Sequence, residues 1–271
     1  MADAEDVIVR LLKLSISIIV YISDRVADGL RKCLSSGNTR RHVILYYHSI
    51  PDEKRDKFSH QMDMVKRHAE PIMLTGNINT SKSAVSITFD DGIENVYRNA
   101  VPELVARGIP FTIFVTSGYV GRQADWIKNR AEYREERLMS VEQLLEISKM
   151  ELAEIGSHSV SHKDLTTIDE NDARREIAES KNMLEKILNV EILTFSYPYG
   201  KYSRTHVTYA KEAGYMRTYS IEPRVASLEG YVNGRFSVGL DDWDMEFILK
   251  MKSSYRWLIA VAKWKSLISK Y

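Results

Sequence analysis

The sequence contains one cysteine, no excess of charge of either sign, and no long uncharged apolar run. Cys33 has no partner for an internal disulfide or for a cysteine-based zinc or redox site, which suits a reducing compartment. The 38 basic and 37 acidic residues leave a net charge of +1, so no overall field attracts nucleic acid. We therefore expect Cys33 to be a small buried side chain, and we expect no nucleic-acid partner.

The N-terminal apolar segment is interrupted by charge. Residues 7–22 include Arg10 and Lys13, and no small-residue cleavage site follows, so a secretory signal peptide is not expected. The uncharged part covers only residues 14–23, whereas a membrane span needs about 18–20 apolar residues. An amphipathic helix over residues 1–40 is the favoured interpretation, and a transmembrane helix is the alternative.

The C-terminal stretch has the pattern of a basic amphipathic helix. Trp257, Val261 and Trp264 recur at helical spacing, with Lys263 and Lys265 among them. Such a helix can lie on a membrane surface. The alternative is that both terminal helices pack on the domain between them.

Short apolar runs alternate with helical patterns through the rest of the chain. A hydrophobic content of 44% over 271 residues is enough for a full core, and no repeat or Pro/Gly-rich linker divides the chain. Strands alternating with helices predict a mainly parallel sheet, here a distorted (β/α)7-type barrel with extra terminal helices. We expect one domain over residues 41–252, preceded by residues 1–40 and followed by a helix over residues 253–271. The candidate strands are His42–Tyr47, Val85–Phe89, Phe111–Val115, Leu152–Ser157, Leu193–Tyr197, Met216–Ser220 and Arg235–Val238.

Two motifs follow candidate strands, at the end where such barrels carry their chemistry. In "TFDDG", Asp90 and Asp91 are adjacent carboxylates that repel each other unless a cation separates their roles. In "HSVSH", His158 and His162 lie four apart, so one helical turn would bring both imidazoles to the same ion. Two histidines and a carboxylate leave open positions for water, as in catalytic zinc sites. An acidic helix cap would explain "DDG" in isolation, but it leaves the histidine pair unexplained.

A third motif, "YPYG", brackets Tyr199 between Pro198 and Gly200. The turn that these residues fix could aim the Tyr199 N–H at the metal site, as an oxyanion-hole donor.

The three motifs, in this order and at these separations, resemble the polysaccharide deacetylases of carbohydrate esterase family 4. The similarity covers roughly Arg41 to Lys252. It implies a distorted barrel and metal-dependent removal of acetyl groups from N-acetylated sugars. The opening "YH" strand and the "FSHQM" segment resemble the branch that deacetylates poly-N-acetylglucosamine.

The resemblance implies a role for each motif residue. Asp90 would be the general base, and Tyr199 would supply the oxyanion N–H. Asp91, His158 and His162 would bind one divalent metal ion, with zinc expected first and nickel, cobalt or iron as alternatives.

Two departures from the family pattern concern the acid and an arginine. No histidine follows His206, so the usual late acid is absent. We assign His48 as the general acid, because the first and last strands of a closed barrel are neighbours. The arginine that usually precedes the proline-tyrosine-glycine turn is replaced by Ser196 or Tyr197. Arg235 is a candidate substitute, and a surface ion-pair residue is the other interpretation.

Aromatic and turn residues near the motifs are candidate substrate contacts, although aromatic side chains at such places are as often core. The candidates are Tyr47, Trp126, Tyr197, Pro198 and Arg235.

The expected function is hydrolysis of the acetamido group of an N-acetylated saccharide, which releases acetate. The substrate can be a polymer, an oligosaccharide or a lipid-linked precursor. A deformylase or amidase acting on another amide, and an inactive carbohydrate-binding protein, are the alternatives. The lack of a cleavable signal predicts a cytoplasmic location, with peripheral contact at the inner face of the membrane if the terminal helices lie there. The sequence leaves the oligomeric state open.

Overall fold

The computed structural model describes residues 4–34, 41–76, 83–128, 135–227 and 229–268. The strands are β1 (His42–Tyr47), β2 (Glu70–Pro71), β3 (Ala84–Phe89), β4 (Phe111–Val115), β5 (Ala153–Ser157), β6 (Thr194–Ser196), β7 (Arg217–Tyr219), β8 (Val232–Asn233) and β9 (Phe236–Ser237). The helices are α1 (Ala4–Leu34), α2 (Arg55–His68), α3 (Val101–Ala106), α4 (Asp125–Lys128), α5 (Val141–Ile147), α6 (Glu170–Leu188), α7 (Arg204–Glu212), α8 (Asp244–Met251) and α9 (Leu258–Ile268). A π-helical turn, Val96–Ala100, leads into α3.

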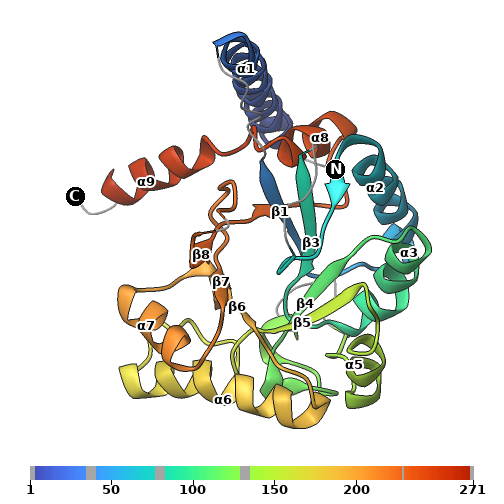
Figure 1. The fold of residues 1–271 in the computed structure, drawn as a ribbon, viewed down its shortest axis with the longest axis vertical. Coiled ribbons are helices and arrows are strands. Elements are labelled where there is room, and N and C mark those ends of the chain that lie inside the picture. Colours follow the sequence, from blue (N-terminus) through green and yellow to red (C-terminus); the bar gives the residue numbers. More distant parts are fainter. Residues whose placement is uncertain (1–3, 35–40, 77–82, 129–134, 228, 269–271) are drawn as a thin grey trace.

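The strands form one parallel sheet that curls into a partial barrel with helices outside it (Figure 1). The order is β8-β7-β6-β5-β4-β3-β1-β9, with β2 beside β3. Strands β1, β3 and β4 are buried along their whole length, as parallel strands covered on both faces are. The predicted barrel-type α/β fold is confirmed.

The expected closure of the barrel is wrong in one respect. The sheet ends at β8 and β9, and among the described residues no strand pairing joins these two. Strand β9 still pairs with β1, through Leu45 opposite Phe236 and Tyr46 opposite Ser237. The first and last strands are therefore neighbours, as the assignment of His48 requires.

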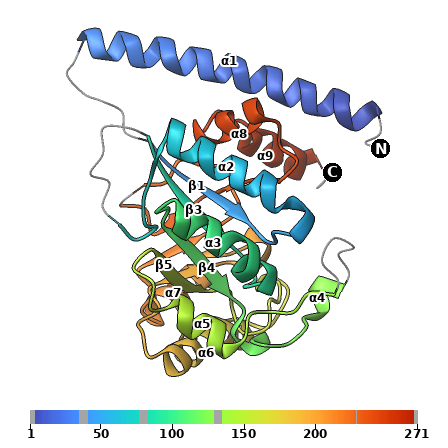
Figure 2. The same cartoon turned by 90° about the vertical axis from the view of Figure 1, so that its right-hand side faces the viewer.

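Helix α1 extends across one side of the molecule, above α8, α9 and α2 (Figure 2). One face of α1 is docked by polar contacts. The Trp257 Nε1 donates to Ser17 Oγ at 2.9 Å, and the Arg256 guanidinium makes two bonds of 2.7 Å to the Asp24 carboxylate. Arg10 donates to Glu246 of α8 at 2.8 Å. The side chain of Cys33 lies outside the described residues.

Within the described residues, no helix combines the length and the apolar character needed to cross a membrane.

At the C-terminus, α9 begins at Leu258, one residue after Trp257. Trp257 therefore lies in the preceding turn and contacts α1, whereas Trp264 is 64% exposed. The side chains of Lys263 and Lys265 lie outside the described residues.

Candidate active site

The carboxyl ends of β1 and β3 bring His48 and the Asp pair together. The Asp90 N–H donates to the Tyr47 carbonyl at 2.9 Å, which extends the ladder between β1 and β3 by one step. Because side chains alternate along a strand, Tyr46 and His48 face the barrel interior, and their rings lie 5.6 Å apart. His48 is half-buried beside the two carboxylates.

Three residues of the motifs adopt left-handed backbone conformations, which are uncommon outside glycine. The φ angles are 70° at Asp91, 56° at His162 and 57° at Tyr199. Each such residue costs on the order of 1–3 kcal/mol, and such strain concentrates at functional sites. The chain therefore holds these three residues against their backbone preference.

The side chains of Asp91, His158 and His162 form a buried cluster whose ligand atoms all lie within 4.8 Å of one another. Asp91 Oδ1 is 3.1 Å from His162 Nε2 and 3.7 Å from His158 Nε2. The expected helical turn between the histidines is wrong. Ser159, at φ 66°, and His162 reverse the chain instead, and the Ser159 Oγ accepts the His162 N–H at 3.0 Å.

A backbone carbonyl fixes the tautomer of His158. Its Nδ1 lies 2.8 Å from the Ser196 carbonyl oxygen, which can only accept, so Nδ1 carries the proton. The unprotonated Nε2 then points at Asp91. A metal ligand is oriented in this way by the hydrogen bond of its other ring nitrogen.

The cluster has an unsatisfied oxygen that a cation would complete. Asp91 Oδ1 is buried and faces the Nε2 atoms of both histidines, yet it has no hydrogen-bond partner among the described residues. A lone pair on His158 Nε2 facing a carboxylate is unfavourable without a positive charge between them. Two imidazoles and one carboxylate are a donor set that suits zinc and similar divalent ions.

Burial and charge shift the pKa values of these groups in ways that favour a metal ligand. Burial works to raise the pKa of Asp91, but its contact with His162 and the nearby His48 and His158 lower it overall. Burial lowers the pKa of His158 to about 4. At neutral pH the cluster therefore offers an ionised carboxylate and a neutral His158 imidazole.

Asp90 is held by a buried arginine. Arg235 is 0% exposed, and its Nη1 and Nη2 donate to Asp90 Oδ1 and Oδ2 at 2.7 Å each. Nη2 also donates to Ser196 Oγ at 2.7 Å. Burial works to raise the Asp90 pKa, but Arg235 and then His158 outweigh it, so the pKa is lowered. The surface interpretation of Arg235 is wrong, because this guanidinium is the buried partner of the predicted base.

Aromatic rings enclose His162. Trp126 stacks on it with ring centres 4.5 Å apart and planes 12° apart, and Tyr199 meets it edge-on at 4.7 Å. Trp126 comes from α4, in the insertion between β4 and α5. Of the expected substrate contacts, Trp126 therefore packs against a metal-ligand candidate. Tyr199, the predicted oxyanion-hole residue, is 44% exposed.

Two other expected substrate contacts belong to the core. Tyr197 is 0% exposed and stacks on Tyr202 at 4.9 Å. Tyr47 is 2% exposed and donates to Gln61 at 2.8 Å. Pro198 is also buried. Tyr197 therefore packs in the core, away from a sugar ring. Tyr47 is nearly buried but lines the cavity beside His48, so its contact with substrate stays a prediction.

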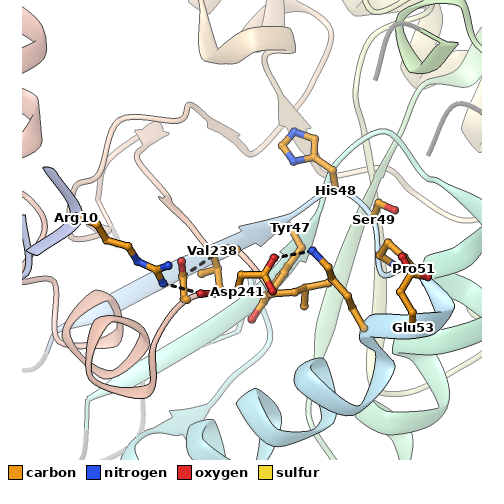
Figure 3. A pocket seen from close by; sticks show the side chains of 12 residues that line it. Arg10, Tyr47, His48, Ser49, Pro51, Glu53, Val238 and Asp241 are labelled. Atoms are coloured by element: carbon orange, nitrogen blue, oxygen red, sulfur yellow. Dashed lines mark hydrogen bonds and ion pairs between the residues drawn. The ribbon is translucent and has the colours of Figure 1, made fainter. Parts of the chain in front are cut away.

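A cavity of about 330 Å³ opens beside His48. Its wall continues through Ser49, Pro51 and Lys54 to Asp241, and Arg10 of α1 lines the opposite side (Figure 3). The ammonium of Lys54 contacts the Asp241 carboxylate at 2.6 Å, and the Arg10 Nη2 donates to the Asp241 carbonyl at 2.6 Å. The lining offers many polar groups, as a site for a hydroxyl-rich ligand would.

Two supporting residues were not found from the sequence. Ser196 serves His158 through its carbonyl and Arg235 through its hydroxyl. Glu176 of α6 accepts the N–H groups of Val160 and Ser161 at 2.9 and 2.8 Å, so it anchors the loop between the histidines. The only signal for Glu176 was a charged residue at an inward position of an amphipathic helix.

Residues 77–218 match the sequence profile of the polysaccharide deacetylase family. The chain belongs to this family. The chain is 28% identical over 156 residues to YxkH of Bacillus subtilis, a protein whose name describes it as a polysaccharide deacetylase. This match covers 58% of the chain and 51% of YxkH. The chain is 27% identical over 157 residues to a Staphylococcus aureus poly-beta-1,6-N-acetyl-D-glucosamine N-deacetylase, with 54% and 50% covered. The chain thus matches about half the length of these curated relatives.

The fold is similar to that of IcaB from Ammonifex degensii. The TM-score is 0.65 at 25% identity, and the match covers 79% of this chain and 98% of that one. The expected family is confirmed, and the staphylococcal relative is a deacetylase of the expected poly-N-acetylglucosamine branch.

Proposed function

We propose that the protein is a metal-dependent N-deacetylase that hydrolyses the acetamido group of an N-acetylated amino-sugar glycan. The observation that carries this proposal is the adjacency of two differently partnered carboxylates. Asp91 lies against two histidines, whereas Asp90 is bound by Arg235 and lies in sequence next to Asp91. Membership of the polysaccharide deacetylase family and the name of the staphylococcal relative support the substrate class.

Asp91, His158 and His162 would hold the cation, with zinc the first expectation. When bound, such an ion polarises the acetyl carbonyl and makes a nearby water more acidic. His158 is oriented for this task by the Ser196 carbonyl, and the loop carrying both histidines is anchored by Glu176.

Asp90 takes the proton from the attacking water. Its lowered pKa keeps it ionised at neutral pH, and the two bonds from Arg235 fix the position of its oxygens. Attack forms the new carbon–oxygen bond, and the Tyr199 N–H would stabilise the negative charge on the carbonyl oxygen.

His48 donates a proton to the amine nitrogen as the carbon–nitrogen bond breaks, which releases acetate and the free amino sugar. An amide anion is too basic to leave without this proton. The position of His48 beside the cavity that extends to Arg10 supports this role, since the sugar could occupy that polar space.

The test is metal content and acetate release in the same preparations. We expect near-stoichiometric divalent metal and acetate release from N-acetylglucosamine oligomers, with both lost in His158→Ala. His60→Ala, at an exposed histidine that contacts Asp244, is the matched control and should keep both. Release of formate from formylated amino sugars without release of acetate would contradict the acyl group proposed. No metal in the parent after reconstitution would contradict the metal site.

A further inference from the structure

The outward face of α1 is apolar along most of its length. Ten apolar residues of this helix are exposed, each with 39% to 66% of its surface accessible to solvent. Together they present on the order of 900 Å², above the roughly 300–600 Å² of the largest apolar patch on a typical monomer. These residues are Val7, Ile8, Val9, Leu11, Leu12, Ile16, Ile19, Ile22, Val26 and Leu30.

Helical geometry places these residues on one broad stripe. At about 100° per residue, Ile8, Leu12, Ile19 and Val26 fall within a sector of about 40°, and the stripe as a whole is about 160° wide between residues 8 and 30. This stretch is about 33 Å long at 1.5 Å per residue. No charged residue falls inside the stripe, because the charged residues of this part of α1 occupy its rim or its docked side.

The polar side chains within the stripe are satisfied inside the helix. Ser15 donates its hydroxyl to the Leu11 carbonyl at 2.9 Å, and Ser23 donates to the Val20 carbonyl at 2.8 Å. A hydroxyl bonded to its own helix in this way needs no water. The stripe can therefore enter an apolar medium without leaving these two donors unpaired.

The rim of the stripe carries positive charge. Lys13 and Arg31 flank one edge and Arg25 the other, and all three side chains are exposed. The acidic groups of this part of the helix lie on its docked side, where Asp24 binds Arg41 and Arg256. Asp28 lies between Arg41, at 3.4 Å, and the rim residue Arg31, at 3.9 Å. Long basic side chains can cover apolar surface with their stems while their charged ends reach a polar boundary.

The shape of the stripe favours a flat apolar surface over a second helix. A two-stranded coiled coil uses a narrow seam, with charged residues beside it that select the partner. Here Val9, Leu11, Ile16 and Leu30 fill those flanking positions, and Ser15 would occupy the seam itself. An identical helix would cover only part of the apolar face and would bring basic rims together.

We infer that α1 is an interfacial helix that seats the protein on a membrane containing anionic lipid. The apolar stripe enters the boundary of the acyl chains, and Lys13, Arg25 and Arg31 meet the phosphate groups. The docked side of the helix keeps its contacts with α8 and with the turn before α9. This inference stands independently of the proposed reaction.

Vesicle sedimentation of the full chain tests the inference. The parent should bind vesicles of phosphatidylcholine with phosphatidylglycerol, and bind less to phosphatidylcholine alone or at high salt. The double variant Ile19→Glu/Ile22→Glu should partition at least about tenfold less, because two carboxylates would have to enter the apolar boundary. Val105→Glu, at a valine of α3 that is 45% exposed, is the matched control and should bind like the parent.

Three results would overturn the inference. The parent could fail to bind either kind of vesicle, or the double variant could bind as well as the parent. The parent could also elute as a dimer that the double variant splits, with no vesicle binding, which would make a second copy the occupant. Circular dichroism and metal content of each variant separate loss of binding from loss of folding, and two single variants, Ile19→Glu and Ile22→Glu, replace any double variant that misfolds.

Discussion

Arg235 and Asp90 are 145 positions apart in the sequence and make two parallel hydrogen bonds of 2.7 Å in the barrel interior. The arginine directly precedes β9, and the aspartate follows β3, with β1 between these strands. A buried carboxylate would favour its protonated form, and the guanidinium reverses that preference. The ionisation of the proposed base therefore depends on a residue from the other end of the chain.

Substitution of Arg235 should move the pH dependence of the reaction. In Arg235→Gln the Asp90 pKa rises, so the base becomes protonated at a higher pH. The acidic limb of the kcat/KM profile therefore shifts to higher pH. Arg235→Lys keeps the charge but loses the paired geometry, and we expect an intermediate shift. Arg224→Lys, at an exposed arginine paired with Glu222, should leave the profile unchanged. An unmoved acidic limb in Arg235→Gln would contradict this role.

Substitution of His48 should affect substrates according to their leaving groups. His48→Ala should lower kcat on an N-acetylated sugar by on the order of 10²–10⁴, the usual contribution of a general acid. On 4-nitrophenyl acetate the loss should be much smaller, because the phenolate leaves without a proton. His60→Ala should behave like the parent on both substrates. Equal losses on the amide and the ester would assign His48 to another role.

Removal of the Trp126 ring should weaken metal binding. The indole stacks on His162 and restricts its orientation, and losing such support costs about 10–100-fold in metal affinity. We expect Trp126→Ala to lose its metal at a lower chelator concentration than the parent protein does. Trp126→Phe should restore most of the metal affinity. Trp264→Ala, at an exposed tryptophan, is the control. Metal affinity unchanged in Trp126→Ala would show that the stacking does not position the ligand.

The stability of the protein should fall in mild acid partly because of His42. Burial lowers the His42 pKa from 6.5 to about 4, and its Nε2 lies 2.8 Å from Ser86 Oγ. Between these two pH values the His42 imidazole is protonated in the unfolded chain but neutral in the folded protein. The free energy of unfolding therefore decreases as the pH falls from 6.5 to about 4, by about 3 kcal/mol in total.

Urea unfolding across this range checks the effect. His42→Gln retains a donor for Ser86 and should flatten the decline relative to the parent, whereas His60→Gln should reproduce the parent curve. A decline in His42→Gln as steep as that of the parent would place the acid sensitivity elsewhere.

Apolar runs and strand ends were readable from the sequence because parallel strands are continuous and buried. The predicted and observed bounds agree for His42–Tyr47 and Phe111–Val115. Strands β2 and β8, of two residues each, were missed because so short a segment carries no pattern. The helix α5 begins after Ser140 with a capping box, in which the Ser140 hydroxyl accepts the Gln143 N–H, and serine and glutamine at this spacing are a pattern readable in the sequence.

The site was predictable in its residue types but not in its backbone. The spacing of His158 and His162 suggested a helical turn, and left-handed residues without glycine bring the two together instead. The burial of Arg235 had no local signal, because its partner lies far away in the sequence. The alternation of side chains along a strand was a further signal in the sequence. Because His48 directly follows Tyr47, a His48 side chain that faces the barrel interior requires the Tyr47 side chain to face outward.

The adjacency of Asp90 and Asp91 divides the site into two halves with different strands behind them. Asp91 belongs with the histidines that follow β5, and Asp90 belongs with His48 after β1 and Arg235 before β9. Ser196 connects the halves, since its carbonyl accepts from His158 and its hydroxyl accepts from Arg235. On the proposed function, a substitution of His48 or Arg235 would leave all three proposed cation ligands in place, and the variant would hold its substrate for longer before each turnover.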